Sequence, residues 1–344
     1  MYIGIDLGTS GVKTILTDES GKVVDSASSS LTVAIPQPLW SEQNPEDWWT
    51  ATCATLDELK QRNDLSVVKA LGLAGQMHGA TLLDKVGQVL RPAILWNDGR
   101  SEAQCRTLES TIIKARVITG NLVMPGFTAP KLLWIKENEP DIFKQVDKVL
   151  LPKDYLRYKL TGEFASDMSD SAGTSWLNTG ERSWSKSMLM ACGLSEKHMP
   201  TLYEGNEITG YLTAKTAKRW GMKAVPVVAG AGDNAAGAVG CGIVDAGQAM
   251  LSLGTSGVYF AVTNDYRSDP ESAVHSFCHA VGHRWHLMSV MLSAASCLDW
   301  FAKNSGYSSV AELFDDVVNN TRPDDPNTPF FLPYLTGERT PHNN

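Results

Sequence analysis

Residues 2–13 read Y-I-G-I-D-L-G-T-S-G-V-K, and the rest of the chain can be interpreted from this stretch. A β-branched, apolar run at 2–6 predicts a strand, and a second apolar run follows at 12–16. Between them, Gly8-Thr9-Ser10-Gly11 predicts a glycine turn whose backbone N–H groups can hold phosphate oxygens. The alternative is an ordinary β-hairpin in which these four residues form only a turn.

Two charged residues flank this turn. Asp6 ends the first predicted strand, and a carboxylate aimed at phosphates repels them unless a cation lies between. The position of Asp6 therefore predicts a Mg²⁺ ion that is held partly through water. Lys13 adds a positive charge within reach of the same phosphates.

The same pattern returns far along the chain. Residues 248–253 predict a strand, Gly254-Thr255-Ser256-Gly257 repeats the G-T-S-G turn, and residues 258–262 predict the return strand. One such turn is weak evidence for a nucleotide site, but two strand–turn–strand units indicate two similarly built domains. We expect the two turns to face each other across a cleft and to hold one set of phosphates.

Composition limits the class of protein. A 344-residue chain that is 43% hydrophobic and 20% charged is long enough for about two globular domains. Its net charge of −8 argues against a nucleic-acid-binding surface, which needs clustered Lys and Arg. The longest weakly polar run, 287–298, is too short to span a bilayer, and no leader precedes the first strand. Six scattered cysteines predict free thiols, so we expect a protein of the cytoplasm with no membrane partner.

Local signals place further elements. Asn44-Pro45-Glu46-Asp47 predicts the start of a helix that runs to about residue 62. Strands are expected at 22–31, 67–74 and 225–229, and helices at 101–113, 128–138, 153–160, 235–241, 293–303 and 310–319. Residues 164–178, rich in Ser, Asp, Thr and Gly, predict loops that cross a cleft, and residues 319–329 predict a polar loop. Three short strands at the start exclude a Rossmann opening, which runs strand, glycine loop, helix.

Asp233 is the candidate general base for phosphoryl transfer to an alcohol. It follows the strand predicted at 225–229 and stands between Gly232 and Asn234, where the backbone can approach a ligand closely. The alternative is that Asp233 only caps the helix predicted at 235–241. Residues 230–235 also fit the dinucleotide pattern G-x-G-x-x-A, but Asp233 would then face a pyrophosphate, and no ribose-binding acid follows at the expected distance.

Several motifs give the chain a resemblance to the FGGY carbohydrate kinases along essentially its whole length. They are D-L-G-T-S-G-V-K (6–13), G-Q-M-H-G (75–79), W-N-D-G-R (96–100), G-F-T-A-P-K-L-L-W-I-K-E-N (126–138), G-D-N-A-A-G (232–237), L-S-L-G-T-S-G (251–257) and L-T-G-E-R-T-P (335–341). The resemblance implies an α/β fold of the actin-like ATPase (ribonuclease H-like) type, with two domains and the active site in the cleft. It divides the chain into an N-terminal domain, residues 1–244, and an incomplete C-terminal domain, residues 245–344.

The resemblance also implies ATP and Mg²⁺ as cofactors and roles for individual residues. Asp233 would take a proton from the terminal hydroxyl of the sugar, and Asp6 would orient Mg²⁺. The residues implied to contact the sugar are Met77 and His78, with Asn234 and Trp96 nearby. Those implied to meet the phosphates are Gly8, Thr9, Ser10 and Lys13 from the first domain and Gly254, Thr255 and Ser256 from the second.

The versions of these motifs make D-xylulose the expected substrate. The alternatives are another sugar or polyol, such as ribulose, gluconate or glycerol, or a non-catalytic actin-like protein that binds ATP or a sugar. Because members of the family continue past residues 335–341, we expect the chain to end within its second domain, before the adenosine-binding loop, and to turn over poorly by itself. The sequence leaves the assembly open, a homodimer included.

Overall fold

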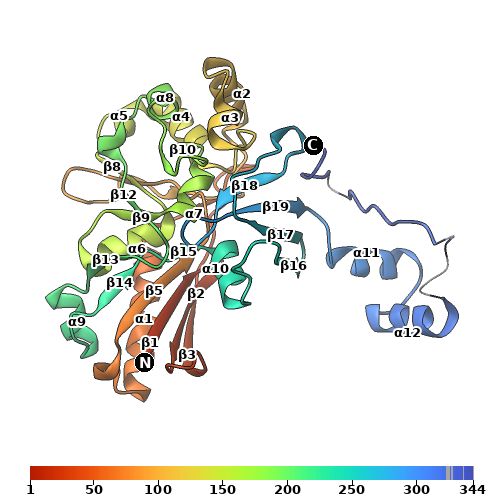
Figure 1. The fold of residues 1–344 in the computed structure, drawn as a ribbon, viewed down its shortest axis with the longest axis horizontal. Helices are drawn as coiled ribbons and strands as arrows, with labels where there is room; N and C mark the ends of the chain where they lie inside the picture. Colours follow the sequence, from red (N-terminus) through yellow and green to blue (C-terminus); the bar gives the residue numbers. More distant parts are fainter. Residues whose placement is uncertain (323–325, 327, 336, 344) are drawn as a thin grey trace.

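The computed structural model describes residues 1–344 except 323–325, 327, 336 and 344. Two β-sheets form its frame, with α-helices packed around the first (Figure 1). Of the loop expected at 319–329 and the motif at 335–341, residues 323–325, 327 and 336 lie outside the described part. Among the described residues, no helix combines the length and the apolar character that a bilayer crossing demands.

The first sheet has a mixed strand order that begins with an antiparallel hairpin. Its strands are β1 (Tyr2–Leu7), β2 (Gly11–Thr17), β3 (Val23–Ser30), β5 (Ala70–Gly75), β13 (Ile208–Tyr211), β14 (Pro226–Val228) and β15 (Ala231–Gly232). The order is β13-β14-β5-β1-β2-β3, and β15 also pairs with β5. Strands β1, β2 and β3 pair antiparallel, whereas β5 runs parallel to β1, β14 and β15. The three antiparallel strands predicted at the start are confirmed, and β5 begins later than expected because residues 65–67 form a 3₁₀ turn.

Helices α1 (Pro45–Arg62), α6 (Pro152–Thr161) and α9 (Ala214–Trp220) pack on the first sheet, and α1 starts as predicted. The Asn44 side chain accepts the N–H of Glu46, and Pro45 occupies the first helical position. Alternate residues of β1 point toward these helices and are fully buried, which makes this face the first core. The inward residues of β1 are Ile3, Ile5 and Leu7.

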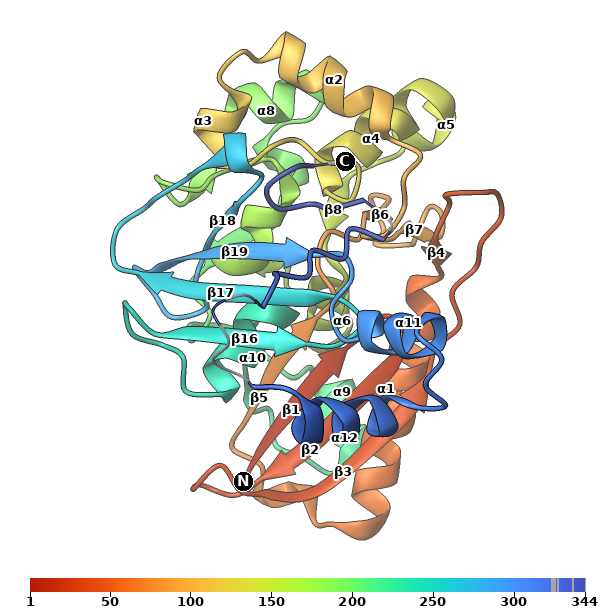
Figure 2. The same ribbon diagram turned by 90° about the vertical axis from the view of Figure 1, so that its right-hand side faces the viewer.

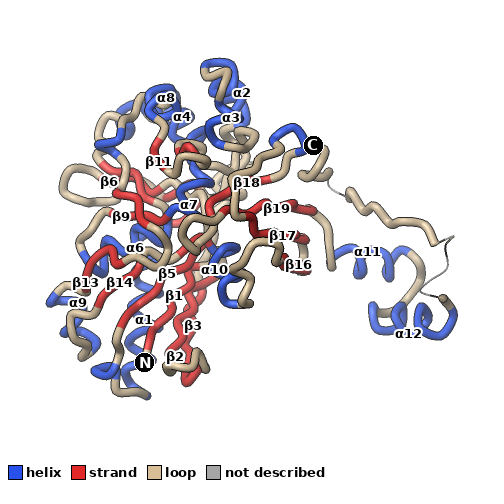
Figure 3. The backbone as a smooth tube through the Cα atoms, in the orientation of Figure 1, coloured by secondary structure: helices blue, strands red, loops and turns tan. Residues whose placement is uncertain are grey.

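Shorter elements form a cap at one end of the first sheet, and Figure 3 shows its helices gathered there. The cap helices are α2 (Glu102–Thr111), α3 (Ala115–Thr119), α4 (Thr128–Asn138), α5 (Pro140–Phe143) and α8 (Lys186–Ala191). Two-residue and three-residue strands pair around them: β4 (Glu42–Gln43) with β7 (Ala93–Ile94), β6 (Thr81–Leu83) with β8 (Lys148–Leu150), and β10 (Leu177–Asn178) with β11 (Ser183–Trp184). The cap has its own hydrophobic core, separate from that of the sheet.

The expectation of loops at 164–178 was wrong for most of that segment. It contains β9 (Ala165–Asp167), which pairs with β12 (Thr201–Tyr203), then α7 (Met168–Ser171) and a 3₁₀ turn at 172–174. Nearly every residue from 165 to 177 is buried. Several of the polar side chains that suggested an exposed loop have partners inside the protein, and those of Asp167, Ser169 and Asp170 include residues remote in the sequence.

The second sheet is antiparallel, and α10 (Asp233–Gly240) lies between it and the first sheet (Figure 1). Its strands are β16 (Ala249–Leu253), β17 (Gly257–Thr263), β18 (His275–Cys278) and β19 (Trp285–Met291), in the order β16-β17-β19-β18. Figure 2 shows these strands running crosswise to β1 and β2. Helices α11 (Ser296–Asn304) and α12 (Val310–Asn320) follow. Met77, Ala238 of α10 and Phe260 of β17 share a third core, so the two sheets meet at the end of β5.

Candidate active site

The Gly8–Gly11 turn and the two charged residues beside it form one edge of the candidate site. The N–H of Gly8 donates to the carbonyl of Gly11 at 2.9 Å, which closes a tight turn between β1 and β2. Asp6 and Lys13 are cross-strand partners in this hairpin, so their side chains lie on the same face. Alternation along β1 places them on the face opposite the first core.

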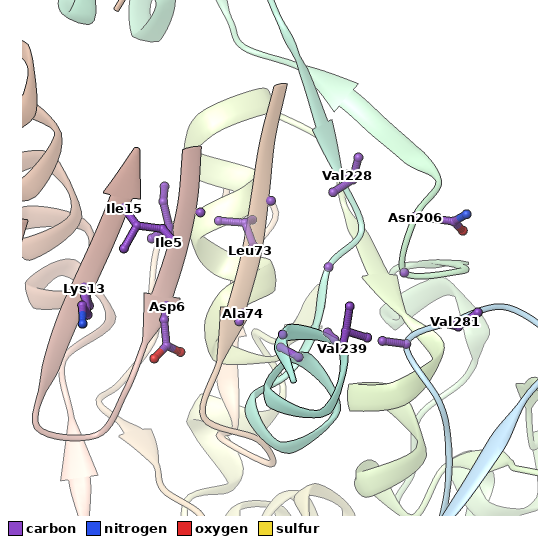
Figure 4. A pocket seen from close by; sticks show the side chains of 18 residues that line it. Ile5, Asp6, Lys13, Ile15, Leu73, Ala74, Asn206, Val228, Val239 and Val281 are labelled. Carbon is purple, nitrogen blue, oxygen red and sulfur yellow. The ribbon is translucent and has the colours of Figure 1, made fainter. Parts of the chain in front are cut away.

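That face borders a cavity of about 750 Å³, which Figure 4 shows from close by. Asp6 and Lys13 lie on one wall, and Val239 of α10 lies on another. Burial raises the pKa of the Asp6 carboxyl, and the positive charge of Lys13 opposes that shift. Among the described residues, none makes a hydrogen bond or a salt bridge to the Asp6 carboxylate. Its oxygens are therefore available to a ligand from outside the chain.

A side-chain network ties the first turn to the loop after β5. The Thr9 hydroxyl donates to Gln76 Oε1 at 2.9 Å and accepts the indole N–H of Trp96 at 3.0 Å. Gln43 donates to the Thr9 carbonyl at 2.7 Å and accepts from Gln76 at 3.0 Å. Because the Thr9 hydroxyl is engaged on both sides, Thr9 would meet a phosphate through its backbone rather than its side chain. Trp96, expected beside the sugar, stands over the Gly8–Gly11 turn.

The loop after β5 presents His78 in a defined tautomer. Nδ1 of His78 lies 2.7 Å from the carbonyl of Gly173, so Nδ1 carries the proton and donates it. Burial, together with the charge of Lys131, lowers the pKa of His78 well below its ordinary value. The ring is therefore neutral, and Nε2 offers a lone pair that can accept a hydrogen bond. His78 also has a φ of 68°, in the left-handed region, where a non-glycine residue is strained and often functional.

Met77, the residue before His78, packs against the backbone that leads to Asp233. A Cβ placed on Gly232 would lie 2.8 Å from Met77 Cγ and 2.9 Å from Met77 Sδ, so only glycine fits there. The absence of a side chain at Gly232 thus lets the loop after β5 approach the start of α10. Met77, which is implied to contact the sugar, therefore lies against the backbone that leads to the candidate base Asp233.

Asp233 is the first residue of α10 and does not cap it. Gly232 is the N-cap and makes no side-chain capping bond, so the interpretation of Asp233 as a helix cap was wrong. Asp233 Oδ1 instead accepts the backbone N–H of Asn234 at 2.7 Å and its side-chain amide at 2.9 Å. Burial raises the pKa of the Asp233 carboxyl to about 6, and the negative charge of Asp6 adds to the shift. Asn234, expected near the sugar, is therefore engaged in orienting the carboxylate.

The second G-T-S-G turn also joins two antiparallel strands, but it is one residue shorter than the first, because Leu253 pairs with Gly257 whereas Leu7 pairs with Val12. The N–H of Gly254 donates to the carbonyl of Ser256 at 3.0 Å, and β16 and β17 pair from Leu253 and Gly257 onward. The carbonyl of Thr255 accepts the N–H of Ala294, just before α11, and no hydrogen bond joins the two turns among the described residues. The repeat is real, while a shared set of phosphates stays a prediction.

Three contributors to the site went unnoticed in the sequence. The Nζ of Lys131 is buried and donates to the carbonyls of His78 at 3.0 Å and Gly126 at 2.7 Å, and burial lowers its pKa to about 7. Gln43 belongs to the network around Thr9, and Gly173 holds the ring of His78. Lys131 could have been found in the sequence, since it stands among apolar residues in the motif 126–138. No pattern in the neighbouring residues marks Gln43 or Gly173 as part of a site.

Comparison with known families and proteins supports the resemblance to the FGGY carbohydrate kinases, and the similar proteins match the whole chain. Residues 1–240 match the N-terminal domain of the FGGY family of carbohydrate kinases. The chain is 66% identical to the xylulose kinase of Escherichia coli (strain K12), over 100% of this chain and 71% of that protein. It is 40% identical to the xylulose kinase of Bacillus subtilis (strain 168), over 99% of this chain and 69% of that protein.

Solved structures give the same picture of the fold. The crystal structure of a kinase from Brucella ovis superposes with a TM-score of 0.94 at 52% identity and covers 100% of this chain and 71% of that one. The xylulose kinase from Rhodospirillum rubrum gives a TM-score of 0.92 at 28% identity, over 99% of this chain and 71% of that one. The actin-like α/β fold expected from the motifs is thereby confirmed.

Proposed function

The chain belongs to the FGGY family of carbohydrate kinases, and from this we propose that it phosphorylates D-xylulose at the expense of ATP, with Asp233 as the general base. One observation carries the assignment of the base: a carboxylate with a raised pKa sits where the start of α10 meets the loop of Met77 and His78. A base that titrates near neutral pH, next to a loop that carries a hydrogen-bond acceptor, suits the removal of a hydroxyl proton.

In the proposed reaction the terminal hydroxyl oxygen of the sugar attacks the γ-phosphorus of ATP. Asp233 accepts the hydroxyl proton as the new O–P bond forms and the bond to ADP breaks. Nε2 of His78 accepts a hydrogen bond from another hydroxyl of the sugar, and Met77 supplies an apolar wall beside it. Asn234 keeps one oxygen of Asp233 engaged, which leaves the other free for the proton.

Asp6 fits the part of a Mg²⁺ ligand. Mg²⁺ is usually held by one or two carboxylates together with waters and phosphate oxygens, and the Asp6 oxygens are not engaged by the described protein residues. When bound, the ion would neutralise charge on the phosphates. Lys13 lies beside Asp6 and would add a second positive charge, while the backbone groups of both G-T-S-G turns would position the phosphates.

Substrate choice tests the proposal directly. We expect release of ADP from Mg-ATP to depend on D-xylulose, with a kcat/KM at least about tenfold above those for D-ribulose, gluconate and glycerol. The measurement is a coupled assay of ADP across this panel. A higher kcat/KM for another member would reassign the substrate, and binding of ATP without any sugar-dependent turnover would favour a non-catalytic role.

The pH dependence provides a separate test of the base. Asp233 must be ionised to accept a proton, and its pKa is raised to about 6. We therefore expect kcat/KM for D-xylulose to be constant above that pH and to fall about tenfold per unit below it. A profile that stays level down to pH 5 would contradict this role, provided that circular dichroism shows the protein folded there.

Two further proposals concern the chain as a whole. We place the domain division at residues 244 and 245, between the end of α10 and the start of β16, near the end of the matched family region. We also propose the cytoplasm as the compartment, because none of the six cysteines is paired and five of them are buried.

A further inference from the structure

We infer that the buried helix α7 is a positioning element for the reaction, and that Ser169 is the residue through which it fixes the start of α10 and hence Asp233. The geometric part of the inference comes from the contacts of α7. Its kinetic consequences rest on the proposed function. Ser169 does not line the cavity, and among the described residues its side chain bonds to none of those implied to meet the substrate. It is a positioning residue, and it acts through Gly232 and the backbone that follows.

The hydroxyl of Ser169 links Gly232 to Asp167. The N–H of Gly232 donates to Ser169 Oγ at 3.2 Å, and Ser169 Oγ donates to Asp167 Oδ2 at 2.5 Å. The same Asp167 oxygen accepts the backbone N–H groups of Ser169 at 2.8 Å and Asp170 at 3.2 Å, which caps α7. Ser169 is 1% exposed, so water cannot replace a lost partner for Gly232 at low cost. The orientation of the residue before Asp233 therefore depends on this hydroxyl.

Asp167 is itself held by a buried ammonium group. The Nζ of Lys153 lies 2.7 Å from Asp167, 2.8 Å from Asp154 and 2.9 Å from Asp170, and all four side chains are fully buried. Arg157, also fully buried, adds a second positive charge beside Asp154. Burial raises the pKa of Asp170 well above its ordinary value, which favours its neutral form and leaves two positive charges against two negative ones. We call this group the Lys153 cluster.

The Lys153 cluster is anchored to several strands and not only to α7. Arg157 donates to the carbonyl of Val228 at 2.6 Å, to that of Ala229, and to the hydroxyl of Thr209 at 3.0 Å. These contacts connect the cluster to β13 and β14 of the first sheet. A group of buried charges with this many fixed partners resists displacement, because any movement leaves a charge or a carbonyl unpaired.

The other end of the same segment reaches the loop that the proposed function assigns to the sugar. The carbonyl of Gly173 accepts from Nδ1 of His78, and a Cβ at Gly173 would lie 2.3 Å from the His78 ring. Ser169 and Gly173 are four residues apart in one buried segment, yet one holds Gly232 and the other holds His78. The segment thus fixes the distance between the proposed base and the proposed sugar contact, a distance on which proton transfer depends.

The test compares two serines of α7. Ser169→Ala removes the hydroxyl that holds Gly232, and we expect kcat for D-xylulose to fall about tenfold or more while KM stays within about twofold. Ser171→Ala is the matched control: its hydroxyl is equally buried and bonds to Ser166 Oγ at 2.9 Å, with no bond to Gly232 or Asp167. We expect the control to lower Tm by a similar amount and to keep kcat within about twofold.

A second measurement does not depend on turnover. Amide hydrogen exchange at Gly232 is expected to speed up at least about tenfold in Ser169→Ala and to stay unchanged in Ser171→Ala. If the wild-type protein shows no xylulose-dependent ADP release, the proposed function fails while the exchange result still decides the role of Ser169. Unchanged exchange at Gly232 in Ser169→Ala, or an equal loss of kcat in both variants, would overturn the inference.

Discussion

Replacing Asp233 with asparagine is expected to lower kcat for D-xylulose phosphorylation by about two to four orders of magnitude, the usual contribution of a positioned general base. Asparagine keeps the size of the side chain and an oxygen that can still accept from Asn234, so α10 should keep its start. What the variant loses is the carboxylate whose raised pKa suits it to take the hydroxyl proton. KM for the sugar should change only a few-fold, because the contacts of Met77 and His78 remain.

The experiment measures steady-state release of ADP and, separately, sugar binding by calorimetry. Asp141→Asn serves as the control, since Asp141 is an exposed acid on α5 that pairs with Lys144 and lies outside the site. We expect the control to match wild type in kcat and KM. An Asp233→Asn protein that binds sugar and keeps kcat within about threefold of wild type would rule out Asp233 as the base.

Replacing Lys153 with methionine is expected to destabilise the protein by about 3–5 kcal/mol, the cost of breaking a buried ion pair by removing one partner. The variant leaves Asp154, Asp167 and Asp170 fully buried with Arg157 as the remaining cation. In the wild type, burial opposes the charge of Lys153, but the aspartates beside it dominate and raise its pKa. The contribution of Lys153 is therefore fully present below the ordinary lysine pKa and is lost only as the pH rises above it.

The variant should strengthen the pH dependence that the raised pKa of Asp170 already gives the wild-type protein. Without Lys153 the buried carboxyl groups have raised pKa values in the folded state, so the folded state binds more protons than the unfolded state. The free energy of unfolding of Lys153→Met should then increase as the pH is lowered from 7 toward 5. Urea denaturation followed by tryptophan fluorescence measures both effects. Lys144→Met, which removes an exposed partner of Asp141, should leave the midpoint unchanged, and an equally small effect at Lys153 would contradict the structural account.

Local chemistry explains which parts could be predicted from the sequence. The Gly8–Gly11 turn and the start of α1 after Asn44 depend on neighbours within a few residues, and each has the expected form. The second G-T-S-G turn was found by the same route. The fold class followed from the resemblance of these motifs to those of the FGGY carbohydrate kinases, and it is confirmed by the relatives and by the solved structures.

The main prediction that was wrong concerns residues whose partners are far away in the chain. Residues 164–178 have the composition of a loop, and only Lys153, with the backbone of Gly232, explains why Asp167 and Ser169 are buried. The start of α10 was placed two residues late, so Asp233 was weighed as a cap that the structure assigns to Gly232.

The tautomer of His78 has a consequence for the charge of the ligands that this enzyme accepts. Because Nδ1–H is committed to Gly173 and the ring is neutral, Nε2 can only accept a hydrogen bond from the sugar that we propose as its ligand. A polyol can answer with a hydroxyl hydrogen, whereas the carboxylate of an aldonic acid brings electron density of its own and would be repelled. If His78 contacts the sugar as proposed, a single backbone carbonyl in a buried helical segment would thus disfavour anionic sugars before any phosphate is transferred.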